Sequence, residues 1–555
     1  MAGKAEDEPI GISLVDADGV TRGWGNPVHR VAPLPHAEWQ EELVEEARKL
    51  ILHRPFHIIW LVLVGVAFLA SRLYNLTVLP TFVDESIHIH SAVEIAESGD
   101  WLDTDRTRLL IIWILRLLLP ITSDIIWSGR LISGLMGLLA AIGCYLVGKS
   151  LFNRRTGAVA FTLYVVSPFT LSNDRLIMSE SYLVAWTVLT MWLSITMVRS
   201  RRPWLHSIGL GFILSLATLT KLSGPLVWGF PLLSLILLNQ DQWRKFPKRW
   251  LALTYAVALL LSFPVSWTPQ VGLKEALDHS VAGGATSSWG NQLWQNVNLL
   301  ISWLWSYLTP GLGVASVVAV VFALWKRPRE GLLLTSWLLA FTVPWFIIGE
   351  FWYPRYILPA FPALFILLGN LLDSLLRWME QLPKRERLVA LSLGLAGAVS
   401  LTVPALYFDY WQLRDPARAP FPEIDRYQYI EGWSAGYRVS GMVEFLRAQA
   451  AEKGDIFVVM SEGVESLMGE LAFDVWRGQE ESLHILKADI PRMSAAEISE
   501  KVSASPLPIY WLVDGSRGPA QLGQEVQSVL HINEMARFSG PGGKSTMVVY
   551  SVSAK

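Results

Sequence analysis

The sequence predicts a polytopic α-helical membrane protein with a small α/β domain at its C-terminal end. Hydrophobic residues make up 52% of its 555 residues, and charged residues only 17%. The apolar residues come in repeated blocks of about 20 residues, the length that a helix needs to cross a bilayer. Short β-rich runs follow the last of these blocks. A large soluble core would not show this spacing of apolar blocks.

The first 57 residues are predicted to be a cytoplasmic region. This polar stretch is too long for the n-region of a signal peptide. Within it, Glu38–Leu50 alternates acidic, basic and apolar residues as an amphipathic helix does. Such a helix lies on a membrane surface or packs on the protein.

About eleven apolar segments then predict a transmembrane domain over residues 58–408. Two further apolar stretches, 107–119 and 297–309, are expected to lie along the membrane surface, the second as a surface or re-entrant helix. The predicted spans are 58–79, 126–148, 157–172, 182–198, 206–220, 223–239, 251–267, 311–325, 331–349, 357–376 and 388–407.

Basic residues occur in every second loop between these spans. The positive-inside rule makes the basic side cytoplasmic. We therefore expect the first long loop, 80–125, and the region from about 409 onward to lie on the outer face. The basic loop residues are Arg48, Lys49, Arg54, Lys149, Arg154, Arg155, Arg199, Arg201, Arg202, Arg244, Lys245, Lys248, Arg249, Lys326, Arg327, Arg329, Lys384, Arg385 and Arg387.

Residues 409–555 are predicted to form an extracytoplasmic α/β domain. Helix-like polar stretches alternate there with the β-rich runs 455–460, 508–513 and 547–552. Alternation of this kind is typical of a sheet covered by helices.

Composition and motifs exclude several classes of function. The net charge of −2 gives no reason to expect a nucleic-acid partner. Cys144 is the only cysteine, so no intrachain disulfide can form. Phosphate-binding loops, dinucleotide fingerprints and hydrolase motifs do not occur where they would be meaningful.

Acidic residues and cations gather on the predicted outer face. Asp84, Glu85 and Glu180 are the carboxylates. Each cation alone is typical of a side chain that reaches from a helix end to the interface. Together, the cations suit an anionic headgroup such as a phosphate, and a carboxylate beside them suits a general base. These cations are Arg130, Arg175, Lys221 and Arg355, the last followed by Tyr356.

His88 and His90 leave a metal site open. The two side chains would share one face if this stretch were a strand, and paired histidines bind divalent metals. No third or fourth ligand occurs at a recognisable spacing. The cofactor expectation is therefore none, with a divalent metal as the alternative.

Five segments carry a resemblance to a known family. The sequence is similar to the membrane-embedded C-type glycosyltransferases (GT-C), in particular to the protein O-mannosyltransferase and aminoarabinose-transferase-like group. The similarity extends over roughly 58–410. The segments are Pro80–Glu85, Ser128–Leu138, Arg175–Glu180, Ala217–Lys221 and Pro354–Pro359.

The resemblance implies a GT-C-like fold and an inverting hexosyl or pentosyl transfer. The donor would be a polyprenyl-phosphate sugar, and the acceptor a protein, lipid or glycan on the non-cytoplasmic face. We expect an integral protein of a prokaryotic cell membrane. Loop 268–296 would serve as a lid over the sugar site.

The resemblance also implies roles for individual residues. Asp84 would take the proton of the acceptor hydroxyl, and Glu85 would support the loop or the acceptor. The donor phosphate would be held by Arg130, Lys221 and Arg355, because negative charge grows there as the glycosidic bond breaks. Glu180 stands where the family often has an aspartate and would contact the acceptor or a metal. Further substrate-binding candidates are Arg175, Tyr356 and His90.

Three other functions remain as alternatives. A transporter of a lipid-linked or small anionic solute would use polar groups inside the bundle. A ligase or polymerase of lipid-linked glycans would perform related chemistry on another fold. A receptor would use the external domain without catalysis.

Overall fold

We analysed a computed structural model of the chain. It divides into two units, residues 1–60 and 61–555, and only residues 56–60 of the first unit are described. The described residues are 56–104, 106–200, 202–239, 246–266, 289–348, 352–460, 464, 468–487, 495–515 and 524–555. The predicted amphipathic helix at 38–50 lies outside these residues, and so does most of the predicted lid.

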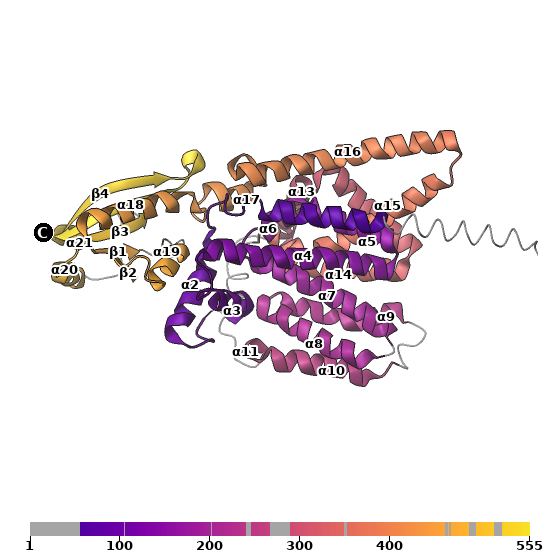
Figure 1. Ribbon diagram of the computed structural model, residues 1–555, viewed down its shortest axis with the longest axis horizontal. Coiled ribbons are helices and arrows are strands. Elements are labelled where there is room, and N and C mark those ends of the chain that lie inside the picture. Colours follow the sequence, from indigo (N-terminus) through magenta and orange to yellow (C-terminus); the bar gives the residue numbers. More distant parts are fainter. Residues whose placement is uncertain are drawn as a thin grey trace, which may run out of the picture. The chain divides into compact units, whose positions relative to one another are not determined.

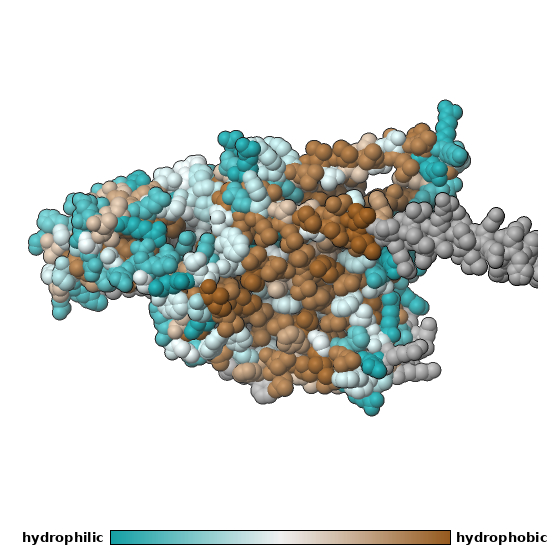
Figure 2. All heavy atoms as spheres, in the orientation of Figure 1, coloured by the Kyte–Doolittle hydropathy of each residue, from teal (hydrophilic) through white to brown (hydrophobic). Residues whose placement is uncertain are grey.

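Seven helices among these residues are long and apolar enough to cross a membrane. Figure 2 shows apolar side chains over the bundle and hydrophilic ones at its two ends. Large apolar side chains such as Trp325 and Val317 are more than half exposed, as lipid-facing residues are in a membrane protein. The seven are Phe56–Leu73, α4 (Ile125–Leu151), α7 (Ser179–Arg199), α8 (Pro203–Thr220), Gly290–Lys326, Pro354–Glu380 and α16 (Lys384–Arg414).

Shorter helices occupy most of the other predicted spans. Helices α4, α5, α7, α8 and α10 pack side by side through the bundle (Figure 1). Because several of these helices are shorter than a bilayer crossing requires, the count of eleven spans stays a prediction. The shorter helices are α5 (Arg154–Val165), α6 (Pro168–Asp174), α9 (Phe230–Leu238), α10 (Lys248–Leu261) and α11 (Phe263–Ser266). Helix α14 (Pro328–Ile348), of 21 residues, occupies the predicted span 331–349.

The apolar stretch 297–309 lies in the first half of α13 (Trp289–Lys326), and the predicted span 311–325 lies in its second half. Thr309, with φ of 62° and ψ of 157°, is not helical, so α13 consists of two helices joined at a kink. Pro310 lacks a backbone N–H for the helical ladder, which fits a break at this point. A surface or re-entrant position for 297–309 stays a prediction.

Two shorter helices precede α4. Helix α2 (Val83–Ser98) follows the first span, and its N3 residue Glu85 accepts a hydrogen bond from the backbone N–H of Phe82. It ends at Gly99, whose φ of 73° is the left-handed conformation that glycine favours. Helix α3 (Leu109–Leu118) comes next, after the 3₁₀ turn η1 (Arg106–Arg108). With ten residues, α3 is too short to cross a bilayer, which agrees with the predicted surface helix at 107–119.

The C-terminal part contains a five-stranded mixed sheet of order β2-β1-β3-β5-β4. Strands β1, β2 and β3 are parallel, whereas β5 pairs antiparallel with both β3 and β4. The three predicted strands occur as β1, β3 and β5; β2 and β4 were not predicted. The bounds are β1 (Ile456–Met460), β2 (Leu483–Lys487), β3 (Ile509–Asp514), β4 (Leu530–Ser539) and β5 (Thr546–Ala554).

Helices cover the sheet. One face packs Val458, Leu512 and Val549 against α18, and the other packs Trp511 and Val548 with α20. The helices are α18 (Val439–Lys453), α19 (Gly469–Trp476), α20 (Ala495–Ala504) and α21 (Gln524–Val529).

The core of the sheet region is continuous with the start of α2. Phe82, Val83 and Met178 share one buried cluster with Met442 and Val458. Residues 61–555 form one compact unit. The domain boundary near residue 409 therefore stays a prediction.

Gly469 provides a test of this contact. A Cβ atom there would lie 2.4 Å from the carbonyl oxygen of Ser86 in α2, too close for backbone atoms to tolerate. We expect Gly469→Ala to lower the free energy of unfolding by about 1–3 kcal/mol. Thermal unfolding in detergent measures this effect.

Gly313→Ala is the matched control. Gly313 lies in α13, and a Cβ there meets nothing within 4 Å, so the change leaves the midpoint unchanged or raises it slightly. Equal midpoints for Gly469→Ala and the wild type would contradict the close packing of α19 on α2.

Candidate active site

The site is built from the ends of four elements. Asp84 lies in the first turn of α2, and Glu180 in the first turn of α7, where a helix N-terminus favours negative charge. Lys221 is the residue after the last turn of α8. Arg355 and Tyr356 lie in the 3₁₀ helix η3 (Pro354–Ala360), which precedes α15 (Phe361–Glu380).

Local contacts fix Lys221 and Arg355. Thr220, next to Lys221, accepts a hydrogen bond from the indole N–H of Trp186 at 3.1 Å. The indole N–H of Trp337 donates to the carbonyl of Pro359 at 2.8 Å and so anchors η3 to α14.

Arg355 links the two carboxylates of the site. Its Nη2 donates to Asp84 Oδ2 at 2.9 Å, and its Nε lies 3.6 Å from Glu180 Oε1. Lys221 Nζ donates to the same Glu180 oxygen at 2.5 Å. The Lys221 ammonium also lies 4.3 Å from the ring centroid of Tyr356, a cation–π contact. Two carboxylates and two cations thus form one connected group.

Asp84 is the most accessible carboxylate of this group. Its side chain is 15% exposed, against 2% for Glu180. Burial alone would raise the pKa of Asp84, but the positive charges of Arg355 and Arg108 outweigh it and hold the pKa below its ordinary value. The carboxylate is therefore ionised at neutral pH and ready to accept a proton.

His88 extends the group on α2. Its Nδ1 lies 2.9 Å from the carbonyl oxygen of Ile177, so this nitrogen carries the proton and donates. Its Nε2 lies 3.3 Å from Arg108 Nη1 and accepts. Burial and then Arg108 lower the pKa of His88 to about 4, so the ring is neutral near pH 7.

Glu85 and Arg130 pair with each other and not with Arg355 or Lys221. For Glu85 this agrees with the expected support of the loop, whereas Arg130 was expected to hold the donor phosphate. Both side chains are fully buried and form a two-bond ion pair of 2.9 and 2.7 Å. Glu85 also accepts from the backbone N–H groups of Phe82 and Ile177. Arg130 Nη1 donates to the carbonyl oxygen of Leu79 at 2.7 Å. Their hydrogen-bonding groups are used within the protein, in contacts that fix the chain entering α2.

Arg175 and His90 also lie apart from the cation group. Arg175 donates to carbonyl oxygens at the end of the first span, including that of Tyr74 at 2.8 Å and that of Asn75 at 2.6 Å. His90 pairs with Glu94 one turn along α2 at 3.3 Å. Because residues 88 and 90 are in a helix rather than a strand, their side chains do not share a face.

Sequence reasoning missed two contributors. Arg108 was assigned only to a surface helix, and Gln428 lies beyond the predicted transmembrane domain. Gln428 accepts a hydrogen bond from Arg355 Nη1. No motif signals such a contact across 73 residues of sequence. Within the described ranges, no group of three or more His, Cys, Asp or Glu side chains could hold a metal ion.

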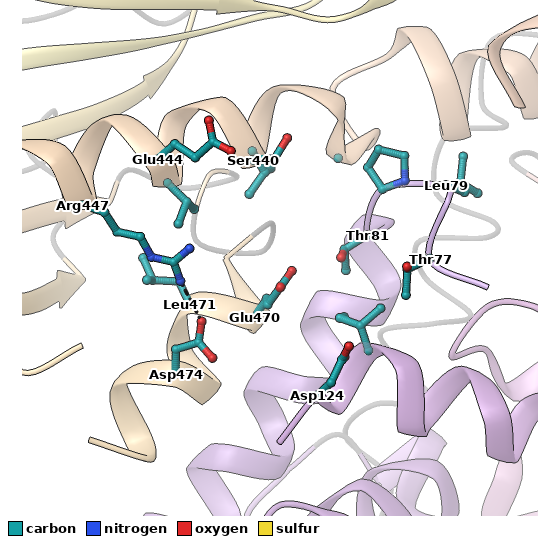
Figure 3. A pocket seen from close by; sticks show the side chains of 15 residues that line it. Thr77, Leu79, Thr81, Asp124, Ser440, Glu444, Arg447, Glu470, Leu471 and Asp474 are labelled. Carbon is teal, nitrogen blue, oxygen red and sulfur yellow. Dashed lines mark hydrogen bonds and ion pairs between the residues drawn. The ribbon is translucent and has the colours of Figure 1, made fainter. Parts of the chain in front are cut away.

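A separate cleft of about 410 Å³ lies nearby, between the loop before α2 and helices α18 and α19. Figure 3 shows Glu444 and Glu470 on one side and Asp124 and Thr81 on the other. Arg447, the cation that lines it, already bonds Asp474 at 3.0 Å. Asp84 does not line this cleft. Its excess of carboxylates makes it unsuitable for a phosphate.

Comparisons with known proteins concern the family and the fold. Residues 106–267 match the family described as dolichyl-phosphate-mannose-protein mannosyltransferase. ArnT from Cupriavidus metallidurans bound to undecaprenyl phosphate is 16% identical, with a TM-score of 0.57 over 89% of this chain and 98% of that chain. The chain has the fold of the membrane-embedded C-type glycosyltransferases.

Two further structures share this GT-C fold. The apo state of the same ArnT is 16% identical, with a TM-score of 0.56 over 90% of this chain and 98% of that chain. The apo oligosaccharyltransferase of Archaeoglobus fulgidus is 13% identical, with a TM-score of 0.50 over 82% of this chain and 69% of that chain. A search of curated proteins found no match in sequence.

These findings confirm the resemblance predicted from the sequence and support a glycosyl transfer function for an integral membrane protein. The matched family segment contains Arg130, Glu180 and Lys221, whereas Asp84 and Arg355 lie outside it.

The buried pair Glu85–Arg130 is expected to be structural. Replacing Arg130 by leucine leaves a carboxylate buried without its partner and costs about 3–5 kcal/mol of folding free energy. Adding Glu85→Leu removes that unpaired charge, so the double variant recovers most of the loss. Denaturant unfolding or the yield of folded protein measures both effects.

Arg155→Leu is the control for the loss of an arginine. Arg155 pairs with Glu380 at the surface, where both side chains are at least half exposed, so its loss costs about 0–1 kcal/mol. If the Arg130→Leu protein is folded and as stable as the wild type but binds the donor more weakly, the structural role is wrong and Arg130 contacts the substrate.

Proposed function

We propose that the protein transfers a sugar from a polyprenyl-phosphate donor to an acceptor hydroxyl on the outer face of the membrane. The observation that carries the proposal is the contact of Asp84, an accessible ionised carboxylate, with Arg355 in a group that also contains Lys221. The GT-C fold supports the choice of reaction. The alternation of basic loops supports the outer face.

The charges of the group favour a singly charged phosphodiester. The two carboxylates and two cations of the connected group, Asp84, Glu180, Lys221 and Arg355, cancel in charge. Arg108, which bonds His88 and acts electrostatically on Asp84, adds one positive charge. With Arg108 included, the group has a net charge of +1, which one donor phosphodiester neutralises. The leaving polyprenyl phosphate carries a second negative charge, and cations already in place stabilise that developing charge.

Asp84 is the general base of the proposed reaction. Its carboxylate takes the proton of the acceptor hydroxyl, and the oxygen attacks the anomeric carbon opposite the phosphate. The bond between that carbon and the phosphate oxygen breaks, and its electron pair leaves with the phosphate. Lys221 and Arg355 hold the phosphate oxygens. One displacement of this kind inverts the anomeric centre.

Glu180 keeps the cations in position before the donor arrives. It is almost fully buried and contacts both Lys221 and Arg355. Without such a carboxylate, two neighbouring cations in a low-dielectric site would repel each other. Glu85, Arg130 and Arg175 would act on the reaction only by fixing the chain that carries Asp84.

The outcome of replacing Asp84 tests the proposal. We expect Asp84→Asn to lower sugar transfer by about 10²–10⁴-fold, because the amide cannot accept the proton. The assay follows transfer or release of sugar from a panel of polyprenyl-phosphate sugars by the purified protein. Glu97→Gln, an exposed change on the same helix, should leave the rate unchanged.

Two results would contradict the proposal. Full transfer by Asp84→Asn would remove Asp84 as the base. Turnover of no donor by the wild type, together with flux of an anionic solute into liposomes, would favour the transporter.

The pH profile gives an independent test of the Asp84 environment. Burial raises the pKa of Asp84, but the charges of Arg355, Arg108 and Lys221 outweigh it and hold the pKa low. His88 adds to this only at the low pH at which it is protonated. The Asp84 carboxylate is therefore lost as base only when the pH falls below the ordinary aspartate range near ~3.9. We expect kcat/KM of the wild-type protein to fall by no more than about twofold as the pH is lowered from 8 to 5. An acid limb near pH 6–7 would contradict the cationic environment of Asp84.

A further inference from the structure

A short segment between α16 and α18 contacts the proposed site. It contains α17 (Glu423–Arg426), the π-helical turn η5 (Tyr427–Glu431) and the 3₁₀ turn η6 (Gly436–Arg438). We call residues 423–438 the linking segment. It connects the last membrane-spanning helix to the helix that packs on the sheet.

The linking segment fixes the start of α2. The backbone N–H of Val83 donates to the carbonyl oxygen of Ser434 at 3.1 Å. Gly436 lies so close to the chain that a Cβ atom there would be 2.2 Å from the carbonyl oxygen of Thr81. Asp84 follows directly after these contacts. The linking segment therefore determines where the helix carrying Asp84 begins.

The same segment is anchored inside the membrane domain. Asp425 is buried and accepts a hydrogen bond from the hydroxyl of Tyr307 in α13. Tyr307 in turn stacks on Phe408 of α16, with ring centroids 5.7 Å apart. Gln428, one turn after Asp425, is 5% exposed. The backbone of Gln428 is also fixed, because Ser434 Oγ donates to its carbonyl oxygen at 2.9 Å.

Gln428 determines one of the three directions in which Arg355 donates. Nη1 of Arg355 bonds Gln428, Nη2 bonds Asp84, and Nε faces Glu180. A guanidinium is planar and its donors form a rigid fork, so fixing one N–H direction fixes the others. Gln428 is a neutral acceptor, which leaves the positive charge of Arg355 available to a phosphate.

We propose that Gln428 is a positioning residue that orients Arg355 toward Asp84 and the donor phosphate from the C-terminal part of the chain. This inference rests on the proposed function of the Asp84 site. It also gives the C-terminal part of the chain a role in the reaction. The linking segment leads directly into α18, the helix that packs on the sheet.

Two substitutions separate orientation from charge. Gln428→Met keeps the length of the side chain but removes the acceptor, so Arg355 loses one of its three polar partners and keeps Asp84 and Glu180. We expect the guanidinium to shift and kcat to fall about ten- to a hundredfold, as small misplacements of catalytic groups do. The acid limb of kcat/KM should also move to higher pH, because a shifted Arg355 stabilises the Asp84 carboxylate less.

Gln428→Glu keeps the acceptor and adds a negative charge. Arg355 stays oriented, so kcat should stay within about threefold of wild type. The net charge of the group falls from +1 to zero, so the donor KM should rise about tenfold or more. Binding of undecaprenyl phosphate, followed by native mass spectrometry, should weaken to the same extent in this variant.

The controls are Tyr427→Phe and Asp84→Asn in the same assays. Tyr427 is 42% exposed, next to Gln428 and outside the site, and its change should leave kcat, KM and the pH profile at wild-type values. Asp84→Asn reports on the proposed function itself. If that variant is inactive and both Gln428 variants behave as wild type, the positioning role is wrong while the proposed function stands.

A purely structural role is also distinguishable. In that case, both Gln428 variants would lower the amount of folded protein, and the remaining folded protein would keep wild-type kcat, KM and pH profile. That result would overturn the inference. If no sugar donor is turned over by the wild type, the proposed function fails. Unchanged undecaprenyl phosphate binding in Gln428→Glu would then overturn the inference as well.

Discussion

The proposed site depends on the contacts that the Arg355 guanidinium makes. This guanidinium bonds Asp84 from α2 and Gln428 from the linking segment, and it faces Glu180 from α7. These three residues lie far apart in the sequence. Because each of them contacts Arg355, this one side chain sets their positions relative to one another. A guanidinium suits this task because it offers several donors in a rigid plane. It also keeps its charge when buried, since its ordinary pKa is so high.

Burial divides the charged residues of the chain into two groups. Glu85, Arg130 and Arg175 have their polar atoms bonded within the protein, and they fix the segment between the first span and α2. Asp84 and Lys221 are also paired, but each is about 15% exposed. In the proposed reaction, their partners would be exchanged for a substrate group. The structural pairs thus provide a rigid frame for the few charges that remain accessible.

Hydrophobic periodicity was enough to locate most of the fold. The apolar blocks predict most helices of the membrane part, because a bilayer-spanning helix needs a long apolar run whatever its neighbours are. The break expected between 297–309 and 311–325 occurs at Thr309, because the following proline cannot donate to the helical ladder. Strands β2 and β4 were missed because strand pairing depends on neighbours that are distant in sequence.

The candidate site was predicted in part. The sequence placed Asp84, Glu180, Lys221 and Arg355 at one membrane face, and the structure brings these four together. It could not separate Arg130 from that set, because a buried arginine and a substrate-binding arginine near the end of a span look alike in the sequence. Gln428 had no signal at all, since a neutral side chain outside the membrane domain matches no charge pattern.

A structure of the protein with a non-hydrolysable polyprenyl-phosphate sugar bound tests the proposed mechanism most directly. We expect the phosphate oxygens to lie within hydrogen-bond distance of Lys221 and Arg355. We also expect the Asp84 carboxylate to face the anomeric carbon from the side opposite the phosphate. A phosphate bound away from both cations, or a sugar that Asp84 cannot reach, would contradict this mechanism.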